Sequence, residues 1–319
     1  MRKDGKGGAS PHTPPGAEPL DPPHKWFQKA PGLWRIQGGA LALLFLMLAH
    51  AHAADLKIAT WNLEWLTLRP QGDPVLPENV VPKRAEDMAA LSRYAVLMDA
   101  DVVAFQEVDG AEAAARVFPP DRYALFMTGD DVVQRVGFAV RRGLVVERHP
   151  DVAGLDVYPG ARFRLRSGAD ITLVLPGGRL RLLNVHLKTG CHGARLASTS
   201  RNCETLRRQV PALQGWIAER NREGAPFVLL GDFNRRMDGR DDLLAALNQS
   251  APLARATQGH ATPCWGGNSF IDHILAGGAA RGWMQIDTMR VLVYRETDPA
   301  AKERLSDHCP VSVRFRLPD

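Results

Sequence analysis

The chain has 319 residues, of which 45% are hydrophobic and 24% charged, and its net charge is +5. These fractions are typical of a globular protein and exclude a disordered chain, a collagen and a membrane protein with many spans. The positive surplus is too small for nucleic acid to be bound by bulk charge alone. An anionic substrate must therefore be attracted locally, by a metal ion or by a few placed side chains.

Residues 1–53 have the pattern of an export signal. The stretch 5–32 is rich in Gly and Pro, which cannot build a core. The apolar run 40–49 follows, and it is far shorter than the roughly 20 residues needed to span a bilayer. Ala51 and Ala53 supply small residues at −3 and −1 of a cleavage position. We expect a disordered leader and a secretory signal, with export to the periplasm or the medium; an uncleaved anchor or a buried helix is the alternative.

Residues 54–319 have the length of one large domain, with no stable membrane span once the signal is cleaved. In chain order we predict a strand over 56–62, a helix over 83–98, strands over 101–107, 123–128, 136–142, 144–148, 171–175 and 179–187, a helix over 204–221, a strand over 227–230, a helix over 241–247, and strands over 270–275, 288–294 and 310–317. Many strands with helices between them indicate an α/β fold of two packed sheets flanked by helices.

The four cysteines are Cys191, Cys203, Cys264 and Cys309, and none forms a C-x-x-C pair. In an oxidising compartment four cysteines suggest two disulfides, for which the sequence allows three pairings. A Cys191–Cys203 bridge is favoured because it closes a short loop with little core of its own, and Cys264–Cys309 would then follow by elimination.

Polar residues cluster where the apolar strands end. The strand endings are Thr60-Trp-Asn-Leu-Glu64, Phe105-Gln-Glu107, Leu183-Asn-Val-His186, Gly231-Asp-Phe-Asn234 and Ser306-Asp-His308, and Ile271-Asp-His273 carries a further Asp–His pair. Polar groups on apolar strands cost free energy unless they are paired or used. Clustered carboxylates repel one another and a phosphate, and Mg²⁺ resolves this because it takes oxygen ligands and leaves room for phosphate oxygens. The set suits metal-assisted hydrolysis of a phosphoester.

These motifs, with Asn184-Val-His-Leu-Lys188, stand in the order found in the endonuclease/exonuclease/phosphatase family, which the chain resembles over about residues 56–317. That family includes pancreatic deoxyribonuclease, abasic-site endonucleases, neutral sphingomyelinases and inositol polyphosphate 5-phosphatases. Each motif is weak alone, but six in order are strong. The resemblance implies a four-layer α/β sandwich in which two packed, mostly antiparallel sheets are flanked by helices.

The resemblance also implies a metal site. Glu107 would be the main Mg²⁺ ligand, Glu64 would help to hold the metal through water, and Asp307 would lie beside it. Mn²⁺ or Ca²⁺ could take the place of Mg²⁺.

The resemblance further implies catalytic roles. Asn62 and Asn234 would hold phosphate oxygens and the nucleophilic water, which Asp232 would orient or activate. His308 would contact the scissile phosphate, steadied by Asp272.

Three further residues are less constrained by the motifs. His186 matches the deoxyribonuclease branch, where a histidine works near the leaving group, but no acid that would orient it is visible in the sequence. Lys188 either contacts phosphate or is an ordinary exposed lysine at a strand end. His273 is expected to be structural, because neighbouring strand residues face opposite ways.

The first hypothesis is an exported, Mg²⁺-dependent phosphodiesterase that acts as a monomer, with DNA or RNA as substrate. The alternatives are a phosphatase or lipid phosphodiesterase acting on inositol phosphates or sphingomyelin, and a binding module of the same fold without activity. The longest rim segments, 67–82 and 150–170, are expected to set the choice of substrate. Arg135, Arg141 and Arg142 either line a substrate groove or are scattered surface residues.

Overall fold

The structure, a computed structural model, describes residues 55–162, 164–267, 269–298 and 300–318. The predicted leader and signal, residues 1–53, lie outside the described residues. Within the described part of the chain, no helix is both long enough and apolar enough to cross a membrane.

In the described part of the chain, twelve strands form two six-stranded sheets. The first has the order β11-β12-β1-β2-β4-β3, with β1 Asp55–Leu66, β2 Val102–Val108, β3 Tyr123–Met127, β4 Arg135–Arg141, β11 Met284–Val291 and β12 Val311–Arg316. The second has the order β5-β6-β7-β8-β10-β9, with β5 Val145–Arg148, β6 Ala169–Leu175, β7 Gly178–His186, β8 Phe227–Asp232, β9 Leu253–Arg255 and β10 Asp272–Gly277. Each sheet has one parallel pair, β1–β2 or β7–β8, and its other pairs are antiparallel.

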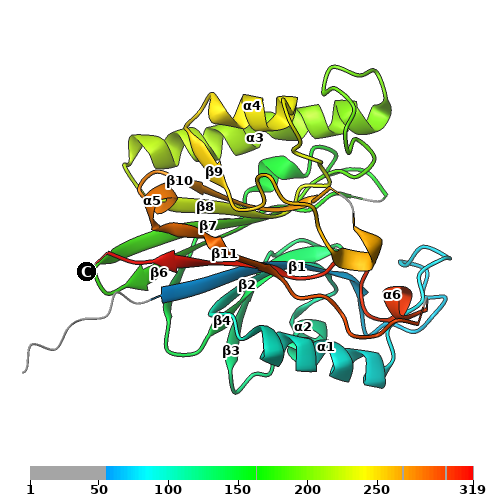
Figure 1. Cartoon of the computed structure of the whole chain (residues 1–319). Coiled ribbons are helices and arrows are strands. Elements are labelled where there is room, and N and C mark those ends of the chain that lie inside the picture. Colours follow the sequence, from blue (N-terminus) through cyan, green and yellow to red (C-terminus); the bar gives the residue numbers. More distant parts are fainter. Residues whose placement is uncertain (1–54, 163, 268, 299, 319) are drawn as a thin grey trace, which may run out of the picture. The chain divides into compact units, whose positions relative to one another are not determined.

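Helices cover the outer face of each sheet, as Figure 1 shows. The α-helices are α1 Ala85–Met98, α2 Ala111–Val117, α3 Arg201–Arg222, α4 Asp242–Asn248, α5 Ala280–Trp283 and α6 Ala301–Arg304, and short 3-10 turns occur at Ala153–Leu155 and Cys264–Gly266. α1 and α2 pack on the first sheet, and α3 and α4 on the second. The predicted fold of two mostly antiparallel sheets flanked by helices is thereby confirmed.

The inner strands of each sheet, such as β1, β2 and β8, are buried on both faces, which explains why they are almost continuously apolar. Along β1, Ile58 joins the core between the sheets, whereas the neighbouring Ala59 and also Trp61 join the core under α1 and α2. This alternation is the two-residue period of a strand. Polar residues are therefore costly along the strands and are tolerated at their ends.

The carboxyl ends of the two parallel pairs position the site. In β1–β2, Asn62 pairs in register with Gln106, one residue before Glu107. In β7–β8, His186 pairs with Asp232. Because the strands of a parallel pair end on the same side, each pair delivers two polar side chains to one edge of its sheet.

The predicted strands and long helices are present, with boundary shifts of a few residues. β11 differs most: it begins at Met284 rather than 288, and its pairing with β12 is irregular between Gln285 and Arg290. Four elements were not predicted, namely α2, β9, α5 and α6. Each has seven residues or fewer, so its pattern is weak, although α4 and β5 are as short and were predicted.

Two disulfides join Cys191 to Cys203 and Cys264 to Cys309, the pairing favoured from the sequence. The first closes 12 residues at the start of α3, and the second ties the 3-10 turn at Cys264 to the residue after His308 across 45 residues. Loop-closure entropy removed from the unfolded chain gives contributions of about 3 and about 4 kcal/mol. The second bridge thus holds the site edge as well as the fold.

Candidate active site

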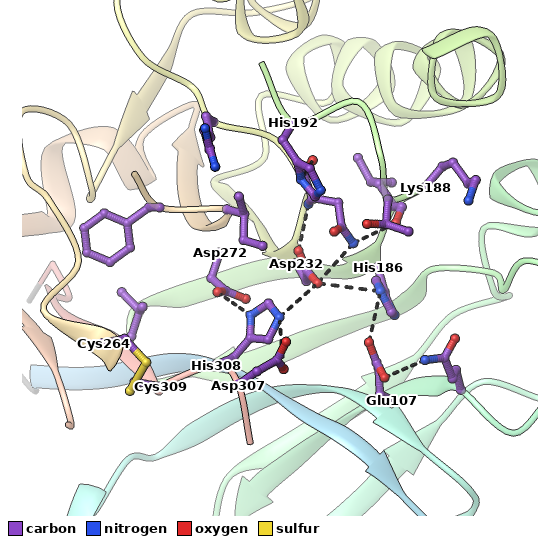
Figure 2. A pocket seen from close by; sticks show the side chains of 18 of the residues that line it. Glu107, His186, Lys188, His192, Asp232, Cys264, Asp272, Asp307, His308 and Cys309 are labelled. Atoms are coloured by element: carbon purple, nitrogen blue, oxygen red, sulfur yellow. Dashed lines mark hydrogen bonds and ion pairs between the residues drawn. A yellow bond between two sulfur atoms is a disulfide. The ribbon is translucent and has the colours of Figure 1, made fainter. Parts of the chain in front are cut away.

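A cavity of about 800 Å³ lies where the strand ends of the two sheets meet, and most of the predicted site residues line it. These are Glu107, His186, Lys188, Asp232, Asn234, Asp272, Asp307 and His308. Figure 2 shows Glu107, His186, Asp232 and His308 pointing toward one another. Five of the six motif segments thus contribute side chains to one shared hollow, whereas Asn62 and Glu64 of the first motif do not line it.

Asn62 connects the two sheets beneath this cavity. Its side chain is fully buried, and its Nδ2 donates to Glu107 Oε1 at 2.9 Å and to Asp232 Oδ2 at 3.0 Å. Its Oδ1 accepts from the backbone N–H of Glu64 at 2.9 Å. Asn62 therefore fixes the positions of two carboxylates that come from different sheets.

Asp232 is the most enclosed carboxylate of the site. Its Oδ1 accepts from the backbone N–H of Asn234 at 2.7 Å, and its Oδ2 accepts from Asn62 and from Asn234 Nδ2 at 3.1 Å. Burial raises the pKa of Asp232 to about 7, opposed by His308 and assisted by the nearby Asp272. A carboxylate with this pKa accepts a proton from water near neutral pH, which is what a general base requires.

The backbone before Asp232 requires glycine. Gly231 has φ of 138°, and a Cβ there would lie 2.0 Å from Val185 O on the parallel partner strand. Only glycine permits this approach of β7 to β8. The glycine of the Gly231-Asp-Phe-Asn234 motif thus brings His186 and Asp232 side by side.

His308 and Asp272 form a close pair. His308 Nδ1 lies 2.7 Å from Asp272 Oδ2, and its Nε2 lies 3.8 Å from Asp232 Oδ2 and 3.6 Å from Asp307 Oδ1. Burial alone would lower the pKa of His308, but Asp272 and Asp232 outweigh it and raise the pKa well above its ordinary value. The imidazole is therefore held as a cation that can donate a hydrogen bond to an anionic oxygen in the cavity.

His186 lies between two carboxylates. Its Nε2 is 3.6 Å from Glu107 Oε1 and 3.6 Å from Asp232 Oδ2, and its buried Nδ1 has no hydrogen-bond partner. Burial, with Arg166 and His308 nearby, lowers the pKa of His186 well below its ordinary value. Glu107 and Asp232 therefore face Nε2 of a neutral ring without a hydrogen bond, and no acid orients His186 through Nδ1 among the described residues.

Glu107 is held by three donors and by an unusual backbone. Its carboxylate accepts from Asn62, from the backbone N–H of Trp65 at 3.2 Å and from Gln134 Nε2. Its φ is 60°, in the left-handed region where a non-glycine residue costs about 1–3 kcal/mol. Such strain persists where the surrounding structure fixes the residue, and here it aims the carboxylate into the cavity.

Glu64 and Asp307, the other predicted metal residues, lie together at the rim. Glu64 Oε2 accepts from the backbone N–H of Asp307 at 2.9 Å and lies 3.9 Å from Lys83 Nζ. Burial and then Asp307 raise the pKa of Glu64 to about 7. Glu64 is therefore held by protein groups, and neither Glu64 nor Asp307 belongs to the two groups of side chains that could hold a metal ion among the described residues.

The donor set fits a divalent cation. Glu107, His186 and Asp232 each place one ligand atom within 4.8 Å of the others, and Asp232, Asp272 and His308 do the same. The first group joins two carboxylates to a neutral imidazole whose Nε2 faces them. A hard cation between Glu107 and Asp232 would neutralise their mutual repulsion, as the family resemblance implies for Glu107.

Of the two remaining predicted residues, Lys188 lies at the cavity and His273 does not. Lys188 lines the cavity, and burial, Arg166 and Arg201 lower its pKa. His273 is structural as expected, because its nitrogens face Thr257 Oγ1 and Arg235 O rather than the cavity.

Three residues of the cavity wall were not found from the sequence: Gln134, Arg166 and His192. Gln134 donates to Glu107, and its Oε1 accepts from Arg166 NH2 at 2.9 Å. His192 Nδ1 lies 3.0 Å from the backbone oxygen of Asn234. All three lie on loops without a local motif, so only their position in the fold reveals them.

Comparisons with solved structures identify the same fold. The chain is similar to TDP2 from Caenorhabditis elegans (TM-score 0.53, 16% identity, 82% of this chain and 98% of that chain). It is also similar to the AP endonuclease LMAP from Leishmania major (TM-score 0.57, 15% identity, 83% of this chain and 88% of that chain). A third similar structure is the 3' phosphatase NExo from Neisseria bound to a product DNA hairpin (TM-score 0.53, 20% identity, 82% of this chain and 99% of that chain). Identities this low establish the fold alone.

A search of curated protein sequences finds no match. The model of the endonuclease/exonuclease/phosphatase family matches residues 59–308, which is more than half of the chain. Enzymes of this family are metal-dependent phosphodiesterases, nucleases and phosphatases. The chain therefore belongs to the endonuclease/exonuclease/phosphatase family.

Proposed function

We propose that this protein is an exported, Mg²⁺-dependent phosphodiesterase that hydrolyses DNA or RNA. The observation that carries the proposal is the convergence of Glu107, Asp232 and His308 on one cavity, with Asn62 donating to both carboxylates beneath it. Two solved structures of the same fold are described with DNA, as a single-strand product and as a product hairpin. They support nucleic acid as the substrate class to test first.

The chain's own residues account for in-line attack of water on phosphorus. Asp232 orients the water and accepts its proton, because burial has raised the pKa of this carboxyl to about 7. His308, held charged by Asp272, donates a hydrogen bond to a phosphoryl oxygen as negative charge builds. When bound by Glu107 with Asp232 or His186 nearby, Mg²⁺ would supply charge neutralisation for the phosphoryl group.

A substrate screen tests this proposal. We expect the purified protein to nick supercoiled plasmid or degrade single-stranded RNA with Mg²⁺ and to lose that activity with EDTA, because the carboxylate cluster then repels the phosphate. Inositol hexakisphosphate and sphingomyelin are the comparison substrates, assayed for released phosphate and phosphocholine. Hydrolysis of either comparison substrate without any cleavage of nucleic acid would refute the proposal, as would a folded, metal-loaded protein that hydrolyses none of them.

Export is part of the proposal, and it rests on the leader sequence and the two disulfides, which persist in oxidising compartments. We expect the protein recovered from the periplasm or medium to begin at Ala54 and to contain no free thiol. Intact mass spectrometry with thiol alkylation, before and after reduction, measures both. A chain that keeps residues 1–53 or carries four free thiols would contradict this expectation.

A further inference from the structure

A second cavity, of about 240 Å³, opens beside the first and shares Trp65, Gln134, Arg164 and Arg166 with it. Its wall combines both predicted rim segments, 67–82 and 150–170, with the start of β4. Five arginines line it, and we call it the arginine pocket: Arg69, Arg135, Arg162, Arg164 and Arg166. Of the predicted groove residues, Arg135 is here, whereas Arg141 pairs with Asp99 and Asp101 and Arg142 donates to Pro120 O.

The arginine pocket carries a positive charge. Asp131 is the single carboxylate among its described lining residues. Arg69 is paired with Asp73 and Asp109, and Arg164 uses its Nε for Asp156 at 2.9 Å. Arg135 donates its Nε only to a carbonyl, Val132 O at 3.0 Å, so its charge is not neutralised by that contact.

Arg166 provides a second, independent indication of an anionic ligand. It is buried, it lines both cavities, and its Nε has no hydrogen-bond partner. Its other nitrogens donate to His186 O at 3.3 Å and Gln134 Oε1 at 2.9 Å. Buried polar atoms are nearly always paired, so this unpaired donor is left for a group that enters the cavities.

Trp65 distinguishes a nucleic acid from a simple polyanion. The side chain lines both cavities and is half-buried. Bases of any sequence stack on aromatic side chains, and strand-binding grooves combine such aromatics with positive charge. A substrate that reaches both cavities must also be elongated, which a phosphodiester strand is and a single inositol ring is not.

We propose that the arginine pocket binds the phosphodiester backbone of a nucleic-acid strand next to the scissile phosphate, with Trp65 contacting a base. Gln134 connects the two places, since it donates to Glu107 and accepts from Arg166. The inference rests on the proposed nuclease function and names where the substrate extends from the metal site.

The test compares the double variant Arg135→Gln/Arg164→Gln with the wild type on a labelled single-stranded oligonucleotide. The slope of log K against log salt is negative, and each lost phosphate contact makes it shallower by roughly 0.7. Two lost contacts should therefore make it shallower by roughly 1.4 and weaken binding about tenfold near 0.15 M salt. Fluorescence anisotropy over a salt series measures both. The loss in kcat/KM for the oligonucleotide should far exceed the loss for the small ester bis(p-nitrophenyl) phosphate, which occupies only the metal site.

Two further variants make the result specific. Arg281→Gln is the matched control, because Arg281 is exposed, also donates its Nε to a backbone oxygen, and lines neither cavity; we expect wild-type binding. Trp65→Ala should weaken oligonucleotide binding more than it weakens competition by inorganic polyphosphate, which has no base to stack.

The outcomes separate this inference from the proposed function. If the wild type cleaves no nucleic acid, the proposed function fails. If the wild type cleaves the oligonucleotide but the double variant keeps the wild-type salt slope and KM, or loses the small ester equally, the arginine pocket is refuted while the nuclease function stands. A double variant that loses inositol hexakisphosphate hydrolysis more than oligonucleotide cleavage would also overturn the assignment of a strand.

Discussion

Replacing Asp232 with asparagine should lower kcat for phosphoester hydrolysis by about 10³-fold or more, because the group that accepts the proton of the attacking water is lost. The change keeps the size of the side chain. The pKa of Asp232 is raised to about 7, so removing the buried charge favours the folded state. The new amide, however, faces the donors of Asn62 and Asn234 and loses hydrogen bonds that the carboxylate accepts, which destabilises the folded state. We therefore expect a nearly unchanged melting temperature.

Asp170→Asn is the matched control for this variant. Asp170 is equally buried, but it lies in β6 away from the cavity, where it pairs with Arg181 and accepts from Trp216. This control should lower the melting temperature and keep the wild-type kcat. Steady-state kinetics with thermal denaturation measures both effects, and an Asp232→Asn enzyme with more than about a tenth of wild-type kcat would exclude Asp232 as the base.

Glu107→Gln should have the second large effect, on metal binding. Loss of a group that merely supports a metal ligand costs about 10–100-fold in metal affinity, so loss of the ligand itself should cost at least that. The new amide also faces three donors, from Asn62, Trp65 and Gln134, which displaces it further. A titration of activity with Mg²⁺ should show a much higher half-saturating concentration, partly overcome by excess metal.

Glu64→Gln provides the comparison for Glu107. Glu64 already accepts from the Asp307 backbone and lies near Lys83, and its predicted contact with the metal is through water. The half-saturating Mg²⁺ concentration should rise far less than in Glu107→Gln. Equal shifts in the two variants would mean that Glu107 is not the principal ligand.

The strand-end motifs made much of the site predictable. Glu107 and Asp232 stand at the carboxyl ends of β2 and β8, where polar side chains are costly unless used. They line one cavity with His308, and Asn62 donates to both carboxylates beneath it. Ser306-Asp-His308 was expected to end a strand, but it lies in the loop before β12. The long helices and strands were also predictable, because their hydrophobic periodicity extends over enough residues to be recognised. The short elements α2, β9, α5 and α6 left no such pattern.

Other parts of the site depend on contacts between distant segments. The carboxylates that face His186 come from β2 and β8, and Arg166 and Gln134 come from loops without a motif. Trp61 and Trp216 are buried, whereas Trp65 and Trp265 line the cavity, which no local pattern distinguishes.

The sequence by itself determined the family, through six short motifs in order, and it predicted the layered fold and the candidate site residues, because periodicity and strand-end polarity are local properties of the chain. The tertiary structure alone decided the electrostatics: which carboxyl is buried enough to have a raised pKa, which imidazole is charged, and which arginines face one pocket. Those properties depend on desolvation and on distances between segments far apart in the sequence, and these exist only once the two sheets have packed together.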